Sequence, residues 1–338
     1  MKTVVFIITK SEIGGAQSWV CEQAKNLQGE CRVVLITSDY GWLTKQPYFS
    51  EIKIVPGLLS ACNLLALISV INILKVCAAD SVIASSANAG LYTRLARCFY
   101  RFKCVYVSHG WSCLYNGGRF KKVFCSIEKY LSYLTDVIWC ISKSDEIKAI
   151  DGIGIKKDKI VTLVNSITPI KDKSSPDFNW RVLFVGRLTH PKRPDLIAEV
   201  ILEDTRFKLD VVGDGDMLPF LIERYKNTDN ISFLGAIDSF SDFYKYDIFV
   251  LLSESEGLPM SAIEACTAGL PMILSDVGGC FEIIDGNNGV LINNDKDELK
   301  SALDLISEQY SFFYGAAREQ KHKFDINKFR NKYKSIIL

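Results

Sequence analysis

The order of short apolar runs along the chain is the feature that most restricts its fold. In the first half, six runs rich in β-branched residues alternate with longer amphipathic segments: "TVVFIIT", "CRVVLIT", "SVIAS", "CVYVSH", "VIWCIS" and "KIVTLVN". The alternation restarts after the polar, proline-bearing residues 169–179, with "RVLFVG", "KLDVVG", "ISFLG", "DIFVLLS", "PMILSD" and "GVLI". Strands that alternate with helices form parallel sheets, so the pattern predicts two doubly wound α/β domains.

The length of the chain fits this organisation. With 338 residues, 48% of them hydrophobic, the chain can bury two cores of ordinary size. We expect an N-terminal domain over residues 1–170, a linker over 171–180 and a second domain over 181–315. Residues 316–338 are predicted to form a C-terminal helix, which could cross back to the first domain.

Cysteine usage and the apolar segments indicate the compartment. Eleven cysteines are scattered without a C-x-x-C pair or a zinc-like cluster, which favours a reducing cytoplasm. The apolar run in "MKTVVFIITKSEIGG" is followed by no cleavage site, so it is read as a first strand. The uncharged residues 58–74 approach the lower limit for a membrane span. Polar residues at multiples of three favour a helix packed on the first sheet over one that dips into a bilayer surface.

Charge is distributed unevenly between the halves. Residues 1–170 hold 20 Lys and Arg against 12 Asp and Glu, a net charge of +8, whereas residues 171–338 hold 20 against 27, a net charge of −7. A basic half suggests an anionic partner, such as a phosphate-bearing substrate or an anionic membrane, although it also fits a solvated face. At a membrane contact we expect Trp111 and Tyr115 to enter the interface. The cations expected to flank them are Lys103, Arg119, Lys121 and Lys122.

Two loops of the first half are candidate binding sites, because ligands of doubly wound sheets bind at the carboxyl ends of the strands. Gly14 and Gly15 end the loop after the first strand, where the next helix would offer free N–H groups to an anion. The pair lacks the G-x-G-x-x-G spacing of a dinucleotide site, and it equally fits a plain connection. His109 follows the strand in "VYVSHGWSC", where a histidine is also compatible with a loop or core position.

A basic loop opens the second half. In "FVGRLTHPKRPDLI", Arg187 and Lys192 follow a buried-looking strand and precede a helix. An arginine can hold phosphate oxygens in a bidentate fork, and a lysine adds a compact charge. The loop therefore suits a diphosphate, the alternative being a solvated basic loop.

Two carboxylates lie eight positions apart in "SESEGLPMSAIEACTAGLP". Glu256 is expected in the loop after a strand, and Glu264 in the early turns of the helix that begins near Pro259. Carboxylates accept hydrogen bonds from vicinal hydroxyls, so the pair could hold a ribose and a second sugar. Compensation of the helix dipole is the alternative for one of them, but it leaves the spacing unexplained.

Four segments of the second half together carry a resemblance: "VGRLTHPKRPDLI", "VVGDGDM", "ISFLGAIDSFSDFYKYDIFVLLSESEGLPMSAIEACTAGLPMILSDVGGCFEIID" and "GVLI". They resemble the donor-binding domain of the retaining glycosyltransferases of family 4, including its E-x7-E element. In the first half, "IGGAQ", "SANAGLYTRLAR", "VSHGW", "SIEKYLSYLTDVIWCISKSD" and "KIVTLVNSI" follow the order of the family. The resemblance implies the GT-B fold, two Rossmann-like domains facing a central cleft. The family often has Asn-Gly where this chain has Asn165-Ser166.

The resemblance also implies a role for each candidate residue. Glu264 would bind the donor ribose, and Arg187 and Lys192 the diphosphate. The donor sugar would be held by Glu256 and by the backbone of Gly257, Leu258, Pro259, Met260 and Ser261. The loop of Gly14 and Gly15 would approach the distal phosphate, and His109 the sugar across the cleft.

A D-x-D pattern at Asp214–Asp216 would mark a metal-dependent transferase of the other main fold. We interpret it instead as the glycine-rich turn after "KLDVV", which matches the phosphate-side loop of the family. The resemblance implies no bound metal and no cofactor other than the nucleotide diphosphate sugar as co-substrate. The cations at Arg187 and Lys192 would stabilise the leaving diphosphate.

The predicted activity is that of a cytoplasmic glycosyltransferase, with possible peripheral contact at the inner face of the plasma membrane. It would transfer a hexose-type sugar from a UDP-sugar to a glycan or lipid-diphosphate-linked acceptor, with retention, in the synthesis of bacterial surface polysaccharide such as O-antigen or capsule. Nucleic acid is not an expected partner. A UDP-sugar isomerase of the same fold and a catalytically silent sugar-nucleotide-binding subunit are the alternatives.

Overall fold

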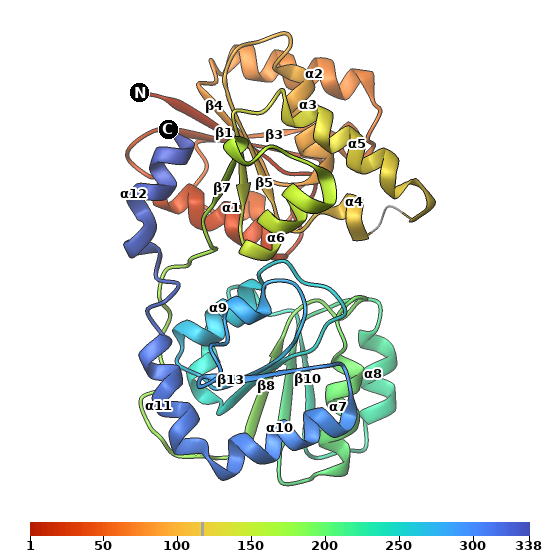
Figure 1. Ribbon diagram of the computed structural model, residues 1–338, viewed down its shortest axis with the longest axis vertical. Helices are drawn as coiled ribbons and strands as arrows, with labels where there is room; N and C mark the ends of the chain where they lie inside the picture. Colours follow the sequence, from red (N-terminus) through yellow and green to blue (C-terminus); the bar gives the residue numbers. More distant parts are fainter. Residues whose placement is uncertain (116–117) are drawn as a thin grey trace. The chain divides into compact units, whose positions relative to one another are not determined.

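The computed structural model describes residues 1–115 and 118–338. The chain forms two compact units (Figure 1). The N-terminal unit contains Met1–Asn165 and Lys328–Leu338, and the C-terminal unit contains Ser166–Asn327. The division lies between Asn165 and Ser166, ahead of the proline-bearing stretch that we read as a linker.

Seven parallel strands form the sheet of the N-terminal unit, in the order β3-β2-β1-β4-β5-β6-β7. They are β1 (Thr3–Ile7), β2 (Arg32–Thr37), β3 (Glu51–Ile54), β4 (Ser81–Ala84), β5 (Lys103–Ser108), β6 (Val137–Cys140) and β7 (Ile160–Thr162). Six of them were predicted from the apolar runs, and β3 was not. The strand order reverses between β1 and β4, which is the switch point where a doubly wound sheet opens a crevice.

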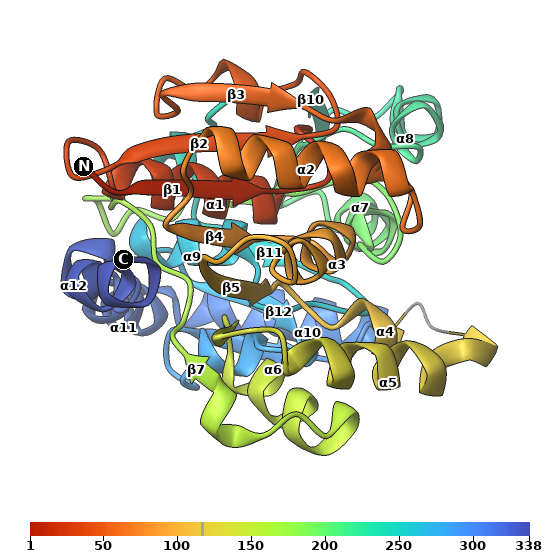
Figure 2. The same ribbon diagram turned by 90° about the horizontal axis from the view of Figure 1, so that it is seen from above.

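Helices cover both faces of this sheet. They are α1 (Gly15–Asn26), α2 (Leu64–Val76), α3 (Ala87–Ala96), α4 (Ser112–Tyr115), α5 (Lys121–Ser132), α6 (Lys143–Ile147) and α12 (Ile326–Ile337). Right-handed crossovers place α2, α3 and α5 together on one face (Figure 2). There Val70 and Leu74 of α2 share a core with Val34 and Ile36 of the sheet. The predicted packing of the apolar 58–74 segment on the first sheet is therefore confirmed. Among the described residues, no helix combines the length and apolarity that crossing a bilayer requires.

The last helix, α12, packs in the N-terminal unit although it comes last in the chain. Its Tyr333 stacks on Trp139 of β6 with the ring centres 5.2 Å apart, and its hydroxyl donates to the carbonyl of Val164. The amine of Lys2 donates to the Leu338 carbonyl at 2.8 Å. These contacts explain why residues after 327 group with the first 165.

The C-terminal unit contains a second parallel sheet, in the order β10-β9-β8-β11-β12-β13. Its strands are β8 (Arg181–Val185), β9 (Lys208–Val212), β10 (Ile231–Gly235), β11 (Ile248–Leu251), β12 (Met272–Ser275) and β13 (Gly289–Ile292). Its helices are α7 (Pro194–Glu203), α8 (Leu218–Tyr225), α9 (Met260–Thr267), α10 (Lys296–Glu308) and α11 (Tyr310–Gln320). All six strands were predicted, and the fold class of two Rossmann-like α/β domains is confirmed. The switch point of this sheet lies between β8 and β11.

Candidate functional site

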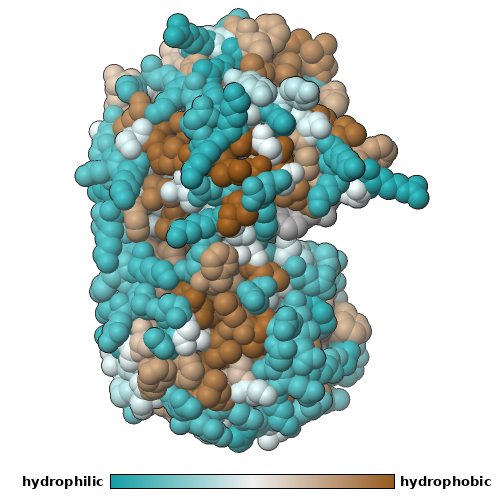
Figure 3. Space-filling view, viewed as in Figure 1, coloured by the Kyte–Doolittle hydropathy of each residue, from teal (hydrophilic) through white to brown (hydrophobic). Residues whose placement is uncertain are grey.

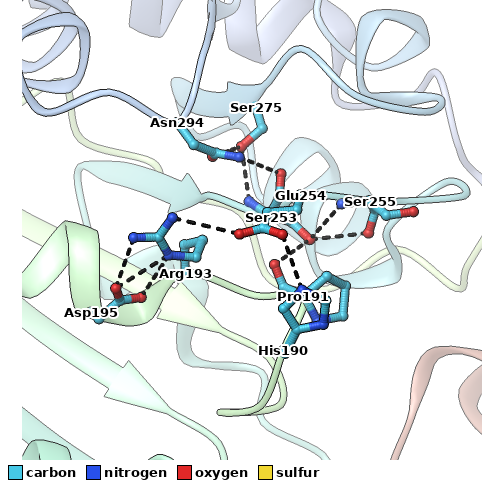
Figure 4. Close-up of polar contacts among 9 residues, drawn as sticks. All are labelled: His190, Pro191, Arg193, Asp195, Ser253, Glu254, Ser255, Ser275 and Asn294. Atoms are coloured by element: carbon cyan, nitrogen blue, oxygen red, sulfur yellow. Dashed lines mark hydrogen bonds and ion pairs between the residues drawn. The ribbon is translucent and has the colours of Figure 1, made fainter. Parts of the chain in front are cut away.

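In the C-terminal unit, the loops that leave β8 and β11 meet at the switch point because these two strands are neighbours. An antiparallel bridge joins Lys192 of the first loop to Ser253 of the second. The Arg193 N–H donates to the Leu252 carbonyl at 2.9 Å, and the Glu254 N–H donates to the Pro191 carbonyl at the same distance (Figure 4). Both candidate loops are thus held in one fixed arrangement by their backbones.

A hydrogen-bonded triangle supports these loops from the neighbouring strands (Figure 4). The Ser253 N–H donates to the Ser275 hydroxyl at 2.9 Å, and this hydroxyl donates to the side-chain carbonyl of Asn294 at 2.6 Å. The Asn294 amide then donates back to the Ser253 carbonyl at 2.9 Å. The three residues follow or end β11, β12 and β13. Sequence reasoning missed them, because their spacings of 22 and 19 positions carry no signal until the strands lie in parallel.

The two predicted donor ligands Lys192 and Glu256 form a direct ion pair. Their side chains are only 15% and 10% exposed. Charges removed from water this far require a partner, since an unpaired buried charge costs several kcal/mol. The pair therefore fixes both groups at the switch point, from positions 64 apart in the sequence.

A second charged group lies at the same edge and is more exposed (Figure 4). Glu254 lies 3.0 Å from the His190 ring and 3.7 Å from the Arg193 guanidinium, which also pairs with Asp195 at 2.9 Å. The hydrogen bonds that the Arg193 guanidinium donates to the Asp195 carboxylate raise the pKa of Arg193. Pairs this exposed contribute little to stability, so they serve mainly to order the loop around Lys192.

The E-x7-E element has the placement expected from its spacing. Glu256 lies in the loop, and Glu264 lies half-buried in the second turn of α9. Between them, the side chains of Leu258, Pro259 and Met260 are buried. This stretch therefore offers its backbone, rather than its side chains, to a ligand.

Glycines permit the close approach of the neighbouring loops. Gly278, after β12, has φ +58°, and a Cβ there would lie 1.9 Å from the Glu256 carbonyl oxygen. The adjacent Gly279 N–H donates to the Gly257 carbonyl at 2.7 Å. Only glycine can occupy position 278 without displacing the backbone that carries Glu256.

The glycine-rich turn after β9 packs in the same way against the loop that carries Arg187. A Cβ on Gly213 would lie 1.8 Å from the Gly186 carbonyl oxygen, and the Leu188 N–H donates to the Asp214 carbonyl at 2.8 Å. The Asp214 carboxylate accepts from the Gly215 N–H at 2.7 Å. The turn thus lies beside exposed Arg187. In the part of the chain that the structure describes, no three His, Cys, Asp or Glu side chains gather as a metal-ligand cluster.

The N-terminal unit has its own switch point, where the loops after β1 and β4 meet. The Thr9 and Ser86 hydroxyls lie 2.6 Å apart and join these loops. Gly14 has extended backbone with φ −176° and directly precedes α1, whose first residue is Gly15. The predicted start of a helix at the Gly-Gly pair is therefore confirmed.

His109 follows β5 at the same edge and contacts Ser85, at the end of β4. The His109 Nε2 lies 2.6 Å from the Ser85 hydroxyl, and the ring packs edge-on against Trp19 with the ring centres 5.3 Å apart. Burial lowers the pKa of His109 to about 3. The ring is therefore neutral near pH 7, with one nitrogen as donor and the other as acceptor. Sequence reasoning did not identify Ser85.

Comparison with known proteins identifies the family. Residues 13–169 match the model "Glycosyltransferase Family 4", and residues 167–327 match "Glycosyl transferases group 1". The chain is 51% identical to the O-antigen biosynthesis glycosyltransferase WbnH of Escherichia coli, with both chains covered in full. The chain belongs to the glycosyltransferases.

Two further comparisons describe this glycosyltransferase. It is 26% identical, over 72% of its length and 70% of the relative, to the UDP-Gal:alpha-D-GlcNAc-diphosphoundecaprenol alpha-1,3-galactosyltransferase of Escherichia coli. It matches the structure of Anabaena Alr3699/HepE in complex with UDP and glucose with a TM-score of 0.85, at 16% identity over 99% of each chain. The glycosyltransferase therefore has the GT-B fold.

The residues predicted for a membrane contact of this glycosyltransferase are only partly placed as expected. Trp111 is buried, and its ring N–H donates to the Asp145 carbonyl at 2.9 Å, so its prediction as an interfacial side chain was wrong. Lys103 begins β5 and donates to the Ser335 carbonyl at 3.2 Å, at the sheet edge opposite the His109 loop. The side chain of Tyr115 lies outside the described residues. Lys121 is exposed, as are Arg119 and Lys122.

Proposed function

We propose that this glycosyltransferase moves a sugar from UDP to a glycan or lipid-diphosphate-linked acceptor in O-antigen assembly, with retention at the anomeric carbon. The observation that carries the proposal is the largely buried Lys192–Glu256 pair, at the switch point of the C-terminal sheet, whose lysine lies on a loop that also carries exposed Arg187. The UDP complex of HepE supports the choice of nucleotide. The names of the two Escherichia coli relatives support the pathway and the lipid diphosphate.

In this proposal, the donor diphosphate shares Lys192 with Glu256. Negative charge grows on the diphosphate as the glycosidic bond breaks, and fixed cations stabilise that charge most where water is excluded. Arg187 adds a bidentate grip on the phosphate oxygens. Glu256, partly released from Lys192, accepts hydrogen bonds from the hydroxyls of the sugar.

The remaining candidate residues bind the neutral parts of the donor. Glu264 accepts hydrogen bonds from the ribose hydroxyls, and the backbone from Gly257 to Ser261 binds the sugar. The loop of Gly14 and Gly15 approaches the distal phosphate, and neutral His109 forms a hydrogen bond with a sugar hydroxyl. A neutral ring suits this role, since a hydroxyl can both donate and accept.

No covalent nucleophile and no metal take part in the proposed reaction. Cys280 lies near the Glu256 loop, but burial raises the pKa of its thiol to about 12, so it stays protonated at neutral pH. We expect turnover to survive EDTA and to be unchanged in Asp216→Ala. Strict dependence on Mn²⁺ or Mg²⁺ that is lost in Asp216→Ala would contradict this part of the proposal.

The decisive experiment is a panel of nucleotide sugars tested for thermal stabilisation, followed by turnover of the best ligand with and without a glycosyl diphosphate acceptor. We expect a UDP-sugar to raise the melting temperature and to be consumed rapidly only with acceptor. NMR of the product should show the anomeric configuration of the donor. Conversion of the donor to an isomer without acceptor would favour the isomerase, and binding without any turnover would favour the silent subunit.

A further inference from the structure

Helix α5 presents an apolar stripe to solvent. Phe120, Val123, Phe124, Ile127 and Tyr130 recur every three or four residues and therefore lie on one side of the helix. All five are exposed, Phe120 by 65% and Tyr130 by 71%. The opposite side of α5 is buried against the unit, so the stripe lies outside the core.

A second exposed apolar surface lies on α2, on the same face of the sheet (Figure 2). Leu64, Leu65, Ile68 and Val76 are exposed, the last by 82%. Helix α3 lies between α2 and α5, and is tied to α5 by the Arg94–Glu128 pair. In Figure 3, apolar side chains gather at the top of the N-terminal unit, over α2, and lie among hydrophilic ones along α5. We call the exposed residues of α2, of α5 and of the turn at residues 118–120 the outer helical face.

The outer helical face is basic as well as apolar. From residue 64 to residue 132 the chain holds nine Lys and Arg but only two Asp and Glu. Three of these cations lie off the face, since Arg94 is buried, Arg97 pairs with Asp136 and Lys103 donates to the Ser335 carbonyl. Both acids are engaged, because Asp80 accepts from the Thr3 N–H at 2.7 Å and Glu128 accepts two hydrogen bonds from Arg94. The exposed cations of the face are Lys75, Arg119, Lys121, Lys122 and Lys129. Among the described residues, no acidic side chain forms an ion pair with any of these five.

We propose that the outer helical face docks the glycosyltransferase on an anionic membrane surface. A helix with an exposed apolar stripe and exposed lysines on its other sides fits the boundary between lipid headgroups and acyl chains, where long cationic side chains reach anionic phosphates. A second copy of the chain fits less well, since a symmetric contact would bring the same cations together. The inference deepens the proposed function, because a lipid-diphosphate acceptor is presented at such a surface.

Vesicle cosedimentation of the full chain, without donor or acceptor, tests the proposal. We expect binding to phosphatidylcholine vesicles that contain phosphatidylglycerol, at least tenfold weaker binding to pure phosphatidylcholine, and release by high salt, because screening shortens the attraction. The Lys121→Glu/Lys122→Glu variant should bind at least tenfold more weakly. Lys156→Glu/Lys157→Glu has the same charge change at exposed positions off this face, and it should bind like the wild type.

The apolar component needs its own variant. Phe124→Ser/Ile127→Ser should reduce binding to the anionic vesicles several-fold, whereas Phe220→Ser/Ile222→Ser, at exposed positions of α8, should not. Melting temperatures would confirm that all variants fold. Equal binding to both vesicle types, no binding to either, or binding that the outer-face variants leave unchanged would overturn the proposal. So would a solution dimer that the outer-face variants dissociate, since a second copy would then cover the face.

Activity separates this inference from the proposed function. With a short-chain, water-soluble diphosphate acceptor, the outer-face variants should turn over donor at the wild-type rate. Normal turnover without vesicle binding in the wild type would overturn the docking surface and leave the transferase proposal standing. Vesicle binding without any turnover would overturn the transferase proposal and leave the docking surface standing.

Discussion

The two sheets reverse their strand order at equivalent points, but the loops at their carboxyl edges differ in chemistry. At the carboxyl edge of the sheet in the C-terminal unit, the Lys192–Glu256 pair and the Arg193–Glu254 contact join loops through charge. We call it the charged edge. At the carboxyl edge of the sheet in the N-terminal unit, the Thr9–Ser86 and Ser85–His109 contacts join loops through hydroxyls and a neutral ring. We call it the hydroxyl-rich edge. The common topology fixes where a ligand can bind, and the loop residues determine which chemistry binds there.

In the proposed function, this difference corresponds to two groups of the donor, the diphosphate and the sugar. A diphosphate carries charge that fixed cations stabilise, so the charged edge suits it. A sugar carries hydroxyls that donate and accept, which suits neutral His109 at the hydroxyl-rich edge as well as Glu256 at the charged edge. The following predictions compare the two edges, from the largest expected effect to the smallest.

The largest effect is expected at the charged edge. Lys192→Ala or Arg187→Ala should lower kcat by about 100-fold or more, as does the loss of a donor that stabilises a developing oxyanion. Steady-state kinetics with a UDP-sugar would measure this effect. Lys245→Ala removes an exposed cation that pairs with Asp242, and it serves as the matched control. A near-normal kcat in the double variant would contradict the assigned role.

Glu264→Ala should weaken UDP binding by several-fold or more while the fold stays intact. The ribose hydroxyls lose an acceptor, at a cost of about 1–3 kcal/mol. Calorimetry measures the affinity directly, with Glu223→Ala on the surface of α8 as the control. Unchanged affinity for UDP would remove the ribose assignment.

Gly278→Ala should destabilise the protein more than Gly286→Ala does. Both glycines have positive φ, at +58° and +94°, so both variants bear backbone strain of about 1 kcal/mol. A Cβ at position 278 would clash with the Glu256 carbonyl, whereas a Cβ at position 286 would lie in open space. Urea unfolding of both variants measures the difference, and the 278 variant should also raise KM for the donor. Equal stability of the two variants would show that the loop around Glu256 yields easily.

The smallest effect is a pH dependence at the hydroxyl-rich edge. Burial lowers the pKa of His109 to about 3, whereas an unfolded histidine titrates near 6.5. Between these values the unfolded chain binds the extra proton, so stability falls as the pH falls from 6.5 towards 3. Urea midpoints at pH 7.5 and 5 should differ more in the wild type than in His109→Asn. The same loss in both proteins would mean that other groups cause it.

The sequence predicted the fold and the candidate residues well where the signal was local. Apolar runs located twelve of the thirteen strands that residues 1–115 and 118–338 form. The exception, β3, is the edge strand "EIKI", where Glu51 and Lys53 interrupt the apolar run. Strand ends located Glu256 and His109, since the candidate loops were chosen at the carboxyl ends of strands.

Long-range contacts were beyond the sequence. Ser275 and Asn294 are common residue types at unremarkable positions, and only the parallel packing of β11, β12 and β13 brings them to Ser253. Trp111 was predicted at a surface because it lies between loop residues, but its ring N–H reaches the Asp145 carbonyl and the side chain turns inwards. Whether such a side chain lies inside or at the surface depends on which hydrogen-bond acceptor the tertiary structure brings near it.

The return of α12 to the N-terminal unit affects the order in which a ribosome can complete the two units. Domains generally fold as units during synthesis, the N-terminal one first. Here Lys328–Leu338 is synthesised only after all of Ser166–Asn327. Trp139 therefore lacks its stacking partner Tyr333 until the C-terminal unit has been made. The unit that is started first is therefore expected to be finished last. A nascent chain that stops at Asn165 would leave this aromatic surface uncovered, as a target for chaperones.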